Sequence, residues 1–143
     1  MTTAQVEVDN QITGSIDKGL VVLLGIEDED NFNDIEWLAR KIMQLRIFSD
    51  LEGKMNLSVQ DINGGVLVIS QFTLHASTKK GNRPSFIKAA KPDYAEEMYL
   101  KFVDHLRNNY SCHVATGQFA AHMNVQLIND GPVTIIIDSK NPE

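Results

Sequence analysis

The sequence has almost no cysteine and no long apolar run. Cys112 is the only cysteine among the 143 residues, which excludes a disulfide framework within the chain. The longest apolar run, Leu20–Ile26, is far shorter than the ~20 residues that span a bilayer. The N-terminus lacks the basic segment and apolar stretch typical of a signal peptide. Together these absences favour a location in the reducing cytoplasm.

The composition excludes a disordered chain. Hydrophobic residues make up 43% of the sequence and charged residues 22%, both ordinary values for a globular protein. A chain of 143 residues is the usual size of one domain and can bury a core without a metal or disulfide. No linker or internal repeat divides it. We therefore expect residues 1–143 to form a single domain.

Charge is distributed unevenly along the chain. The net charge of −6 argues against a general nucleic-acid binder. Residues 75–92, however, contain no acidic residue and five basic ones, namely Lys79, Lys80, Arg83, Lys88 and Lys91. An acidic body with one basic segment can direct a polyanion to one place. A solvated loop that happens to be basic explains the same pattern, so both readings stay open.

Alternating or continuous apolar runs predict about six strands. Asp9-Asn10 has the composition of a two-residue hairpin turn, and Asn129–Pro132 that of a tight turn between the last two strands. The predicted strands are Gln5–Val8, Gln11–Ile16, Leu20–Ile26, Val66–Leu74, Val125–Ile128 and Val133–Asp138.

Two segments have apolar residues at helical spacing. The first runs to about Leu45 and can be capped by Asp30 or Asn31. The second begins near Pro92, a residue suited to the first turn of a helix, and ends near Arg107. Because the helices do not alternate regularly with the strands, we predict an α+β fold. Its sheet is expected to be largely antiparallel and barrel-like, with two main helices.

The sequence lacks several familiar catalytic patterns. No glycine pattern matches a phosphate loop, and none of the four histidines has a partner at the spacing of a zinc site, so no metal site is expected. Two segments are unusual for plain strands. Ser70-Gln71 interrupts an apolar strand, and Gly131-Pro132 places a residue without a backbone donor beside another strand. Each is also compatible with an outward-facing strand residue or a simple turn.

These segments, in their order along the chain, resemble the D-aminoacyl-tRNA deacylase family, formerly called D-tyrosyl-tRNA deacylases. The resemblance covers about Ala4 to Asp138 and rests above all on the Ser-Gln-x-Thr motif at Ser70–Thr73 and the Asn-x-Gly-Pro-x-Thr motif at Asn129–Thr134. The supporting segments are Arg46–Asp50, Glu52–Leu57, Lys80–Phe86 and Thr116–Met123.

The resemblance implies an enzyme of translation quality control. Family members hydrolyse the ester that joins a D-amino acid to the terminal adenosine of tRNA, and they also remove glycine from mischarged tRNA. They use no metal and no organic cofactor, and they act as homodimers whose active sites lie at the subunit interface. The implied partners are therefore the acceptor end of D-aminoacyl-tRNA and a second copy of this chain, with no membrane.

The same resemblance implies the site residues. Ser70, Gln71, Phe72 and Thr73 would form the catalytic segment around the ester and the adenosine. Backbone amides there would stabilise an oxyanion, while the 2′-hydroxyl of the tRNA assists the reaction in place of a threonine nucleophile. This agrees with the absence of a base in the local sequence.

Substrate contacts are implied in two further places. Gly131 and Pro132 of one subunit would enter the pocket of the other with a cis peptide, and their carbonyls would hold the α-ammonium so that an L side chain collides with the loop. Phe119 and Met123 match pocket-wall positions, although each also suits a core. The basic residues Lys79, Lys80 and Arg83 become candidate contacts for the tRNA acceptor stem.

One departure from the family supports another hypothesis. Family chains begin with a further short strand that ends Gln-Arg-Val, and Met1 stands where that valine would be. A catalytically impaired, dimeric RNA-binding module of the same fold is therefore the alternative. An unrelated esterase that uses Ser70 and His75 is a third hypothesis. It requires another residue to orient the histidine, and the sequence alone identifies none.

Overall fold

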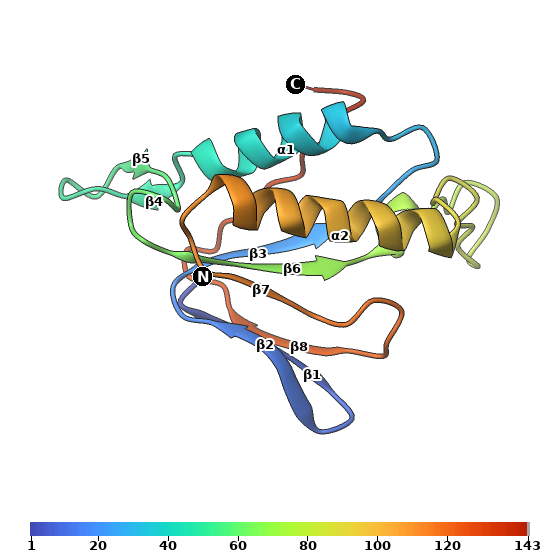
Figure 1. Cartoon of the computed structure of the whole chain (residues 1–143), viewed down its shortest axis with the longest axis horizontal. Helices are drawn as coiled ribbons and strands as arrows, with labels where there is room; N and C mark the ends of the chain where they lie inside the picture. Colours follow the sequence, from blue (N-terminus) through green and yellow to red (C-terminus); the bar gives the residue numbers. More distant parts are fainter. Residues whose placement is uncertain (143) are drawn as a thin grey trace.

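The computed structural model describes residues 1–142 and forms three layers (Figure 1). The helices α1 (Phe32–Gln44) and α2 (Pro92–Asn109) cover one face of a sheet with the order β3-β6-β7. The second sheet, with the order β2-β1-β8, lies on the other side of that sheet. The strands of the two sheets are β1 (Thr3–Val8), β2 (Gln11–Ile16), β3 (Gly19–Leu24), β6 (Gly65–Ser70), β7 (Val114–Thr116) and β8 (Asn124–Ile128).

The central strand β6 explains how two cores form. Two of its residues, Val66 and Val68, are fully buried in the cluster beneath the helices. Leu67 and Ile69, which alternate with them, are buried in the cluster between the two sheets. Successive side chains of a strand point to opposite faces, and a strand covered on both faces is continuously apolar. Burial of both faces of β6 therefore explains the apolar run at the start of the predicted strand Val66–Leu74.

The helices begin and end close to the predicted positions. Asn31 caps α1, because its Oδ1 accepts a 2.9 Å hydrogen bond from the backbone N–H of Asn33. Asp34 returns the interaction by accepting a hydrogen bond from the backbone N–H of Asn31, which completes a capping box. Pro92 is the first residue of α2. Phe102 and Leu106 of α2 are among its fully buried side chains.

The prediction of a largely antiparallel sheet is wrong for half of the main strands. In the sheet β3-β6-β7 both pairs are parallel, with Gly19 opposite Gly65 and Val66 opposite Val114. The sheet β2-β1-β8 is antiparallel, as expected. The sheets of the described residues are not closed into a barrel, whereas the α+β class with two main helices is confirmed. Both apolar strands β3 and β6 are followed by connections that return across the sheet, and this gives the parallel pairs.

Some local elements also differ from the prediction. Residues 133–138 form no strand, and Asn129–Pro132 is no hairpin turn, because this extended segment pairs with no other strand among residues 1–142. The strand predicted over Val66–Leu74 ends at Ser70 and is followed by a short 3₁₀ helix, η1 (Phe72–His75). The structure adds a small ribbon of β4 (Phe48–Ser49) and β5 (Met55–Leu57), together with β7.

No helix of the described chain is long and apolar enough to cross a membrane.

Candidate functional site

The first polar motif lies where two parallel strands end. The strands β3 and β6 run in the same direction, so their carboxyl ends meet at one edge of the sheet. There the backbone N–H of Gln71 donates a 2.8 Å hydrogen bond to the carbonyl oxygen of Leu24. Next the chain turns into η1, and the Gln71 side-chain amide donates to the hydroxyl of Thr73. The hydroxyl of Thr73 thus accepts a hydrogen bond from a neighbour, and no basic side chain of residues 1–142 forms a hydrogen bond with it.

The second motif is a loop closed by its own polar side chains. The Oδ1 atom of Asn129 accepts a 3.3 Å hydrogen bond from the backbone N–H of Val133. Its amide nitrogen lies 3.3 Å from the hydroxyl of Thr134, to which it donates. Between these anchors the Gly131–Pro132 peptide bond is cis, as the resemblance implied. The asparagine and threonine of the motif therefore hold the two ends of the Gly-Pro loop together.

One cavity brings the two motifs to a common space. It has a volume of about 970 Å³, and both Gln71 and Gly131 line it. Its apolar floor is formed by β3, and one wall by the extended residues 133–139. Ligand pockets typically have volumes of 300–1,000 Å³ and are mostly apolar with a few polar groups. The cavity therefore has the size and the lining of a small-molecule or nucleotide-end site.

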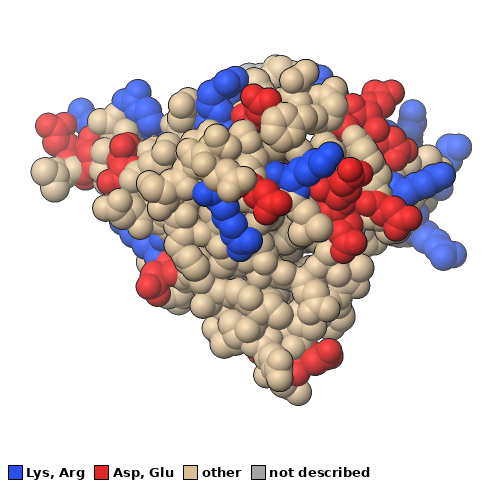
Figure 2. All heavy atoms as spheres, in the orientation of Figure 1, with Lys and Arg blue, Asp and Glu red and all other residues tan. Residues whose placement is uncertain are grey.

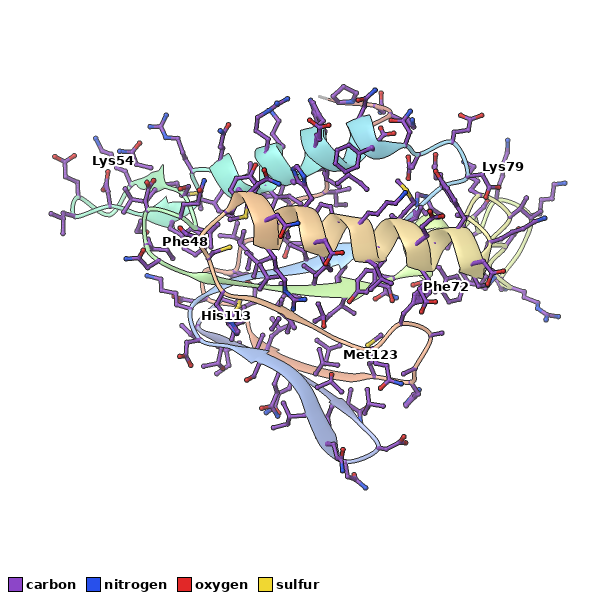
Figure 3. The ribbon with its side chains drawn as sticks, viewed as in Figure 1. Phe48, Lys54, Phe72, Lys79, His113 and Met123 are labelled. Atoms are coloured by element: carbon purple, nitrogen blue, oxygen red, sulfur yellow. The ribbon has the colours of Figure 1, made fainter. Side chains whose placement is uncertain are left out.

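Of the predicted catalytic segment only Gln71 is in the lining of the cavity, and Ser70, Phe72 and Thr73 lie outside that lining. Phe72 and Thr73 are exposed, and Ser70 is half-buried. The ring of Phe72 packs edge-to-face on Phe86, with 5.0 Å between the ring centroids. Figure 3 shows Phe72 at the same end of the molecule as Lys79. The exposed ring of Phe72, packed on the half-buried Phe86, offers a flat surface on which a nucleotide base can stack.

Phe119 and Met123 lie with the core rather than in this cavity. The ring of Phe119 packs edge-to-face on the buried Tyr99, with 5.9 Å between the centroids. Met123 packs against the cluster between the two sheets. Neither residue lines the cavity shared by Gln71 and Gly131. In the single chain their structural role as core residues is thus evident, and the pocket-wall role remains a prediction.

The basic residues extend from the same end of the molecule. Lys79, Lys80 and Arg83 are all exposed on the connection between η1 and α2. Figure 2 shows blue side chains gathered at the right end, next to an acidic region, and Figure 3 labels Lys79 at this end. Among the described residues none of the three forms an ion pair. These cations are therefore available to phosphate groups.

Carboxylates line the cavity on the side of α1. Burial raises the pKa of Asp30, although its hydrogen bond from the backbone N–H of Glu27 opposes this rise. Burial also acts to raise the pKa of Asp34, but hydrogen bonds from the N–H of Asn31 and from Lys140 lower it overall. The Lys140 ammonium lies 3.0 Å from the carboxylate of Asp34. This ion pair fixes the tail to α1 beside the cavity. Among residues 1–142 no cluster of histidine, cysteine and carboxylate side chains could hold a metal ion.

Sequence reasoning missed a histidine–carboxylate pair at the same edge. The Nδ1 atom of His75 lies 3.3 Å from a carboxylate oxygen of Glu27, and both side chains line the cavity. Glu27 could have been found from the parallel pairing, because it follows β3 as His75 follows β6. The Nε2 atom of His75 is buried without a hydrogen-bond partner, so His75 does not activate Ser70. The hypothesis of a Ser70–His75 esterase thus lacks its central hydrogen bond.

Comparison with known proteins identifies the family of the chain. The family model described as D-Tyr-tRNA(Tyr) deacylase matches residues 1–138. The chain is 57% identical over 143 residues to a D-aminoacyl-tRNA deacylase of Flavobacterium johnsoniae, covering 100% of this chain and 95% of that protein. A second D-aminoacyl-tRNA deacylase, from Parabacteroides distasonis, is 57% identical over 140 residues, which cover 98% of this chain and 93% of the relative.

Solved structures have the same fold. A structure titled c-Myc DNA Unwinding Element Binding Protein superposes with a TM-score of 0.89 at 42% identity, covering 94% of this chain and 91% of that one. A probable eukaryotic D-amino acid tRNA deacylase superposes with a TM-score of 0.67 at 15% identity, with 88% of each chain covered. Since the family model spans nearly the whole sequence and the relatives share more than half of their residues with it, the chain belongs to the D-Tyr-tRNA(Tyr) deacylase family, the hydrolases that cleave the ester of D-aminoacyl-tRNA in translation proofreading.

Proposed function

We propose that this enzyme removes D-amino acids, and also glycine, from tRNA at the cavity between the two motifs. The observation that supports this most directly is that Gln71 and Gly131, 60 positions apart in the sequence, open on the same cavity of the chain, so that a two-fold dimer formed across this face would set the Gly131 loop of one subunit against the Gln71 segment of its partner. In this proposal the cytoplasmic enzyme binds the terminal adenosine and its ester at Ser70–Thr73. The Gly131-Pro132 loop contacts the amino acid itself.

The catalytic segment contributes positioning and hydrogen bonds. The hydroxyl of Thr73 receives a hydrogen bond from Gln71 and has no adjacent base, so it is a poor nucleophile. The 2′-hydroxyl next to the ester is instead part of every substrate. We assign it the role of assisting the reaction, while backbone N–H groups of the segment stabilise the developing oxyanion.

The Gly-Pro loop supplies chiral selection. Its carbonyl oxygens are acceptors that suit an α-ammonium group. The hydrogen bonds of the Asn129 side chain with Val133 and Thr134 hold the two ends of the loop together. Once the ammonium and the ester are fixed, the two enantiomers differ only in the direction of the side chain. An L side chain then points into the loop, and a D side chain points away from it. Rejection by such a clash depends little on which side chain is present. Glycine has no side chain and is not rejected.

The loop acts on a second copy of the chain in this proposal. Val125, Leu127 and Ile128 of β8 and Ile135 and Ile136 beyond the loop are large apolar residues with much of their surface exposed. Contiguous apolar surface of this kind marks a protein interface. A dimer built on it would place the loop of one subunit at the cavity of its partner, where Lys79, Lys80 and Arg83 bind the acceptor stem.

The decisive experiment compares D-tyrosyl-, L-tyrosyl- and glycyl-tRNA as substrates of the same protein. We expect rapid release of D-tyrosine and of glycine, and a rate with L-tyrosyl-tRNA close to that of spontaneous hydrolysis. Equal cleavage of both enantiomers would contradict the proposed role of the loop. Binding of tRNA without any turnover would instead support the alternative of a catalytically impaired RNA-binding module.

A further inference from the structure

His75 lies in an unusual position for a polar side chain. Its Nδ1 atom is 3.3 Å from a carboxylate oxygen of Glu27, whereas its Nε2 atom is buried and has no hydrogen-bond partner. A buried polar atom without a partner is rare and calls for an explanation. The other side chains around the cavity do not share this feature among the described residues. Nε2 of His75 therefore needs a structural explanation of its own.

A glycine makes the room that the imidazole occupies. A Cβ atom on Gly25 would lie 2.9 Å from Nε2 of His75 and 3.3 Å from the carbonyl oxygen of Gln71. The imidazole is therefore packed directly on the backbone that continues β3. It also lies close to the Gln71 backbone, the first residue of the turn into η1. Any side chain at position 25 would displace it.

The two partners of the pair lie on different segments, and the segment of Glu27 is firmly held. The backbone N–H of Glu27 donates a 2.8 Å hydrogen bond to Asp30, and the preceding carbonyl oxygen of Ile26 accepts one of 2.8 Å from Ala90. His75 is the last residue of η1, the short helix that carries Phe72 and Thr73. The pair thus links a fixed segment after β3 to the far end of the catalytic segment.

We infer that His75, oriented by Glu27, is a positioning residue that holds the Gln71–Thr73 segment in place for ester hydrolysis. It does so from two directions, because the imidazole rests on Gly25 and its Nδ1 is tied to Glu27. The hydrogen bond between Gln71 and Leu24 fixes only the start of the segment. His75 fixes its end. This inference rests on the proposed placement of the ester at Ser70–Thr73.

The contact with Glu27 also favours a proton on one of the two ring nitrogens. In neutral imidazole one nitrogen donates and the other accepts, and the partner of one fixes the state of the other. A carboxylate oxygen of Glu27 at 3.3 Å favours the tautomer with its proton on Nδ1, which leaves Nε2 bare. In this tautomer Nε2 brings no unsatisfied N–H into the buried space beside Gly25.

The test measures kcat and KM separately for D-tyrosyl-tRNA. Because tRNA binding is assigned to other residues, His75→Ala should lower kcat on the order of tenfold to a hundredfold and leave KM nearly unchanged. His75→Asn places an amide nitrogen near the position of Nδ1 and should restore much of kcat, whereas His75→Gln should not. His113→Ala is the matched control. That histidine is exposed and lies at a distance from Phe72 of the catalytic segment, and its loss should change neither constant (Figure 3).

Two further variants test the pair without removing His75. Glu27→Gln should lower kcat, and the double variant with His75→Ala should be no worse than His75→Ala alone, since coupled residues are not additive. Gly25→Ala should displace the imidazole and reproduce the effect of His75→Ala. Nitrogen-15 NMR of the histidine ring gives a readout besides activity, and we expect the proton on Nδ1 in the wild type.

The possible outcomes separate this inference from the proposed function. Wild-type kcat in His75→Ala, additive effects of the two variants, or a proton on Nε2 would each overturn the role of His75. If Gln71→Ala and Gly131→Ala leave hydrolysis unchanged in an active wild type, the placement of the site is wrong instead. A lower melting temperature of His75→Ala with no change in kcat would assign the pair to stability alone and would likewise overturn the inference.

Discussion

At the scale of single residues, a substitution of Thr73 distinguishes a threonine nucleophile from assistance by the 2′-hydroxyl of the tRNA. Its hydroxyl accepts a hydrogen bond from Gln71 and lacks a general base, so we expect Thr73→Ala to keep most of the wild-type kcat. A substrate ending in 2′-deoxyadenosine should be hydrolysed more slowly by about 10²-fold or more, the usual contribution of a group that transfers a proton. Single-turnover hydrolysis with both substrates measures this. Complete loss of activity in a folded Thr73→Ala that still binds tRNA would favour a threonine nucleophile.

Only some residues of the candidate site could be predicted from the local sequence. The two motifs could be picked out because polar or proline residues interrupt strand-like sequence, and the structure brings Gln71 and Gly131 to one cavity. The pairing of Glu27 with His75 could not be found from local sequence, since 48 positions separate them and only the parallel pairing of β3 and β6 brings them together. Phe119 and Met123 illustrate the reverse problem. An apolar residue at a plausible position fits a pocket wall and a core equally well.

At the scale of elements, the cap of α1 is a local feature that sequence predicts well. Asn31 satisfies a backbone donor that the helix itself leaves free. We expect Asn31→Ala to lower the free energy of unfolding by about 1 kcal/mol, the usual cost of losing such a cap. Urea denaturation measures it, and Asn33→Ala is the control because that side chain is exposed in the same turn and makes no hydrogen bond in the described structure. Equal effects of both variants would show that the cap contributes nothing.

Elements that depend on distant partners were predicted less well. The helices follow from periodicity within one segment, and the hairpin β1-β2 follows from its turn. Whether β3 pairs in parallel or antiparallel fashion depends on the route of the chain between strands, which a run of apolar residues does not encode. Residues 133–138 have a strand-like composition but pair with no strand edge in the described chain. A strand requires a partner as well as a propensity.

At the scale of the whole molecule, apolar surface predicts assembly. We expect a homodimer in light scattering at micromolar concentration, with Ile136 at the interface because 93% of its surface is exposed in the single chain. Ile136→Asp should weaken the dimer by about tenfold or more, since a charge in an interface core loses its water. Ile87→Asp is the matched control, because Ile87 is 90% exposed but lies on the basic connection. A monomeric wild type would contradict the proposed action of the Gly-Pro loop on a partner subunit.

Charge distribution governs how this acidic protein can bind a polyanion. All 19 acidic residues lie outside residues 75–92, so repulsion from the body leaves the basic connection as the favoured approach for tRNA. Each phosphate contact releases counterions and contributes about 0.7–0.9 to the slope of log affinity against log salt. Lys79→Gln should therefore lower tRNA affinity and reduce this slope by about that amount.

The control is Lys54→Gln, at the opposite end of the molecule, which should change neither the affinity nor the slope (Figure 3). Fluorescence anisotropy with uncharged tRNA between about 50 and 200 mM salt measures both quantities independently of hydrolysis. Equal slopes for wild type and Lys79→Gln would remove this residue from the tRNA contact and leave the basic segment as a solvated loop.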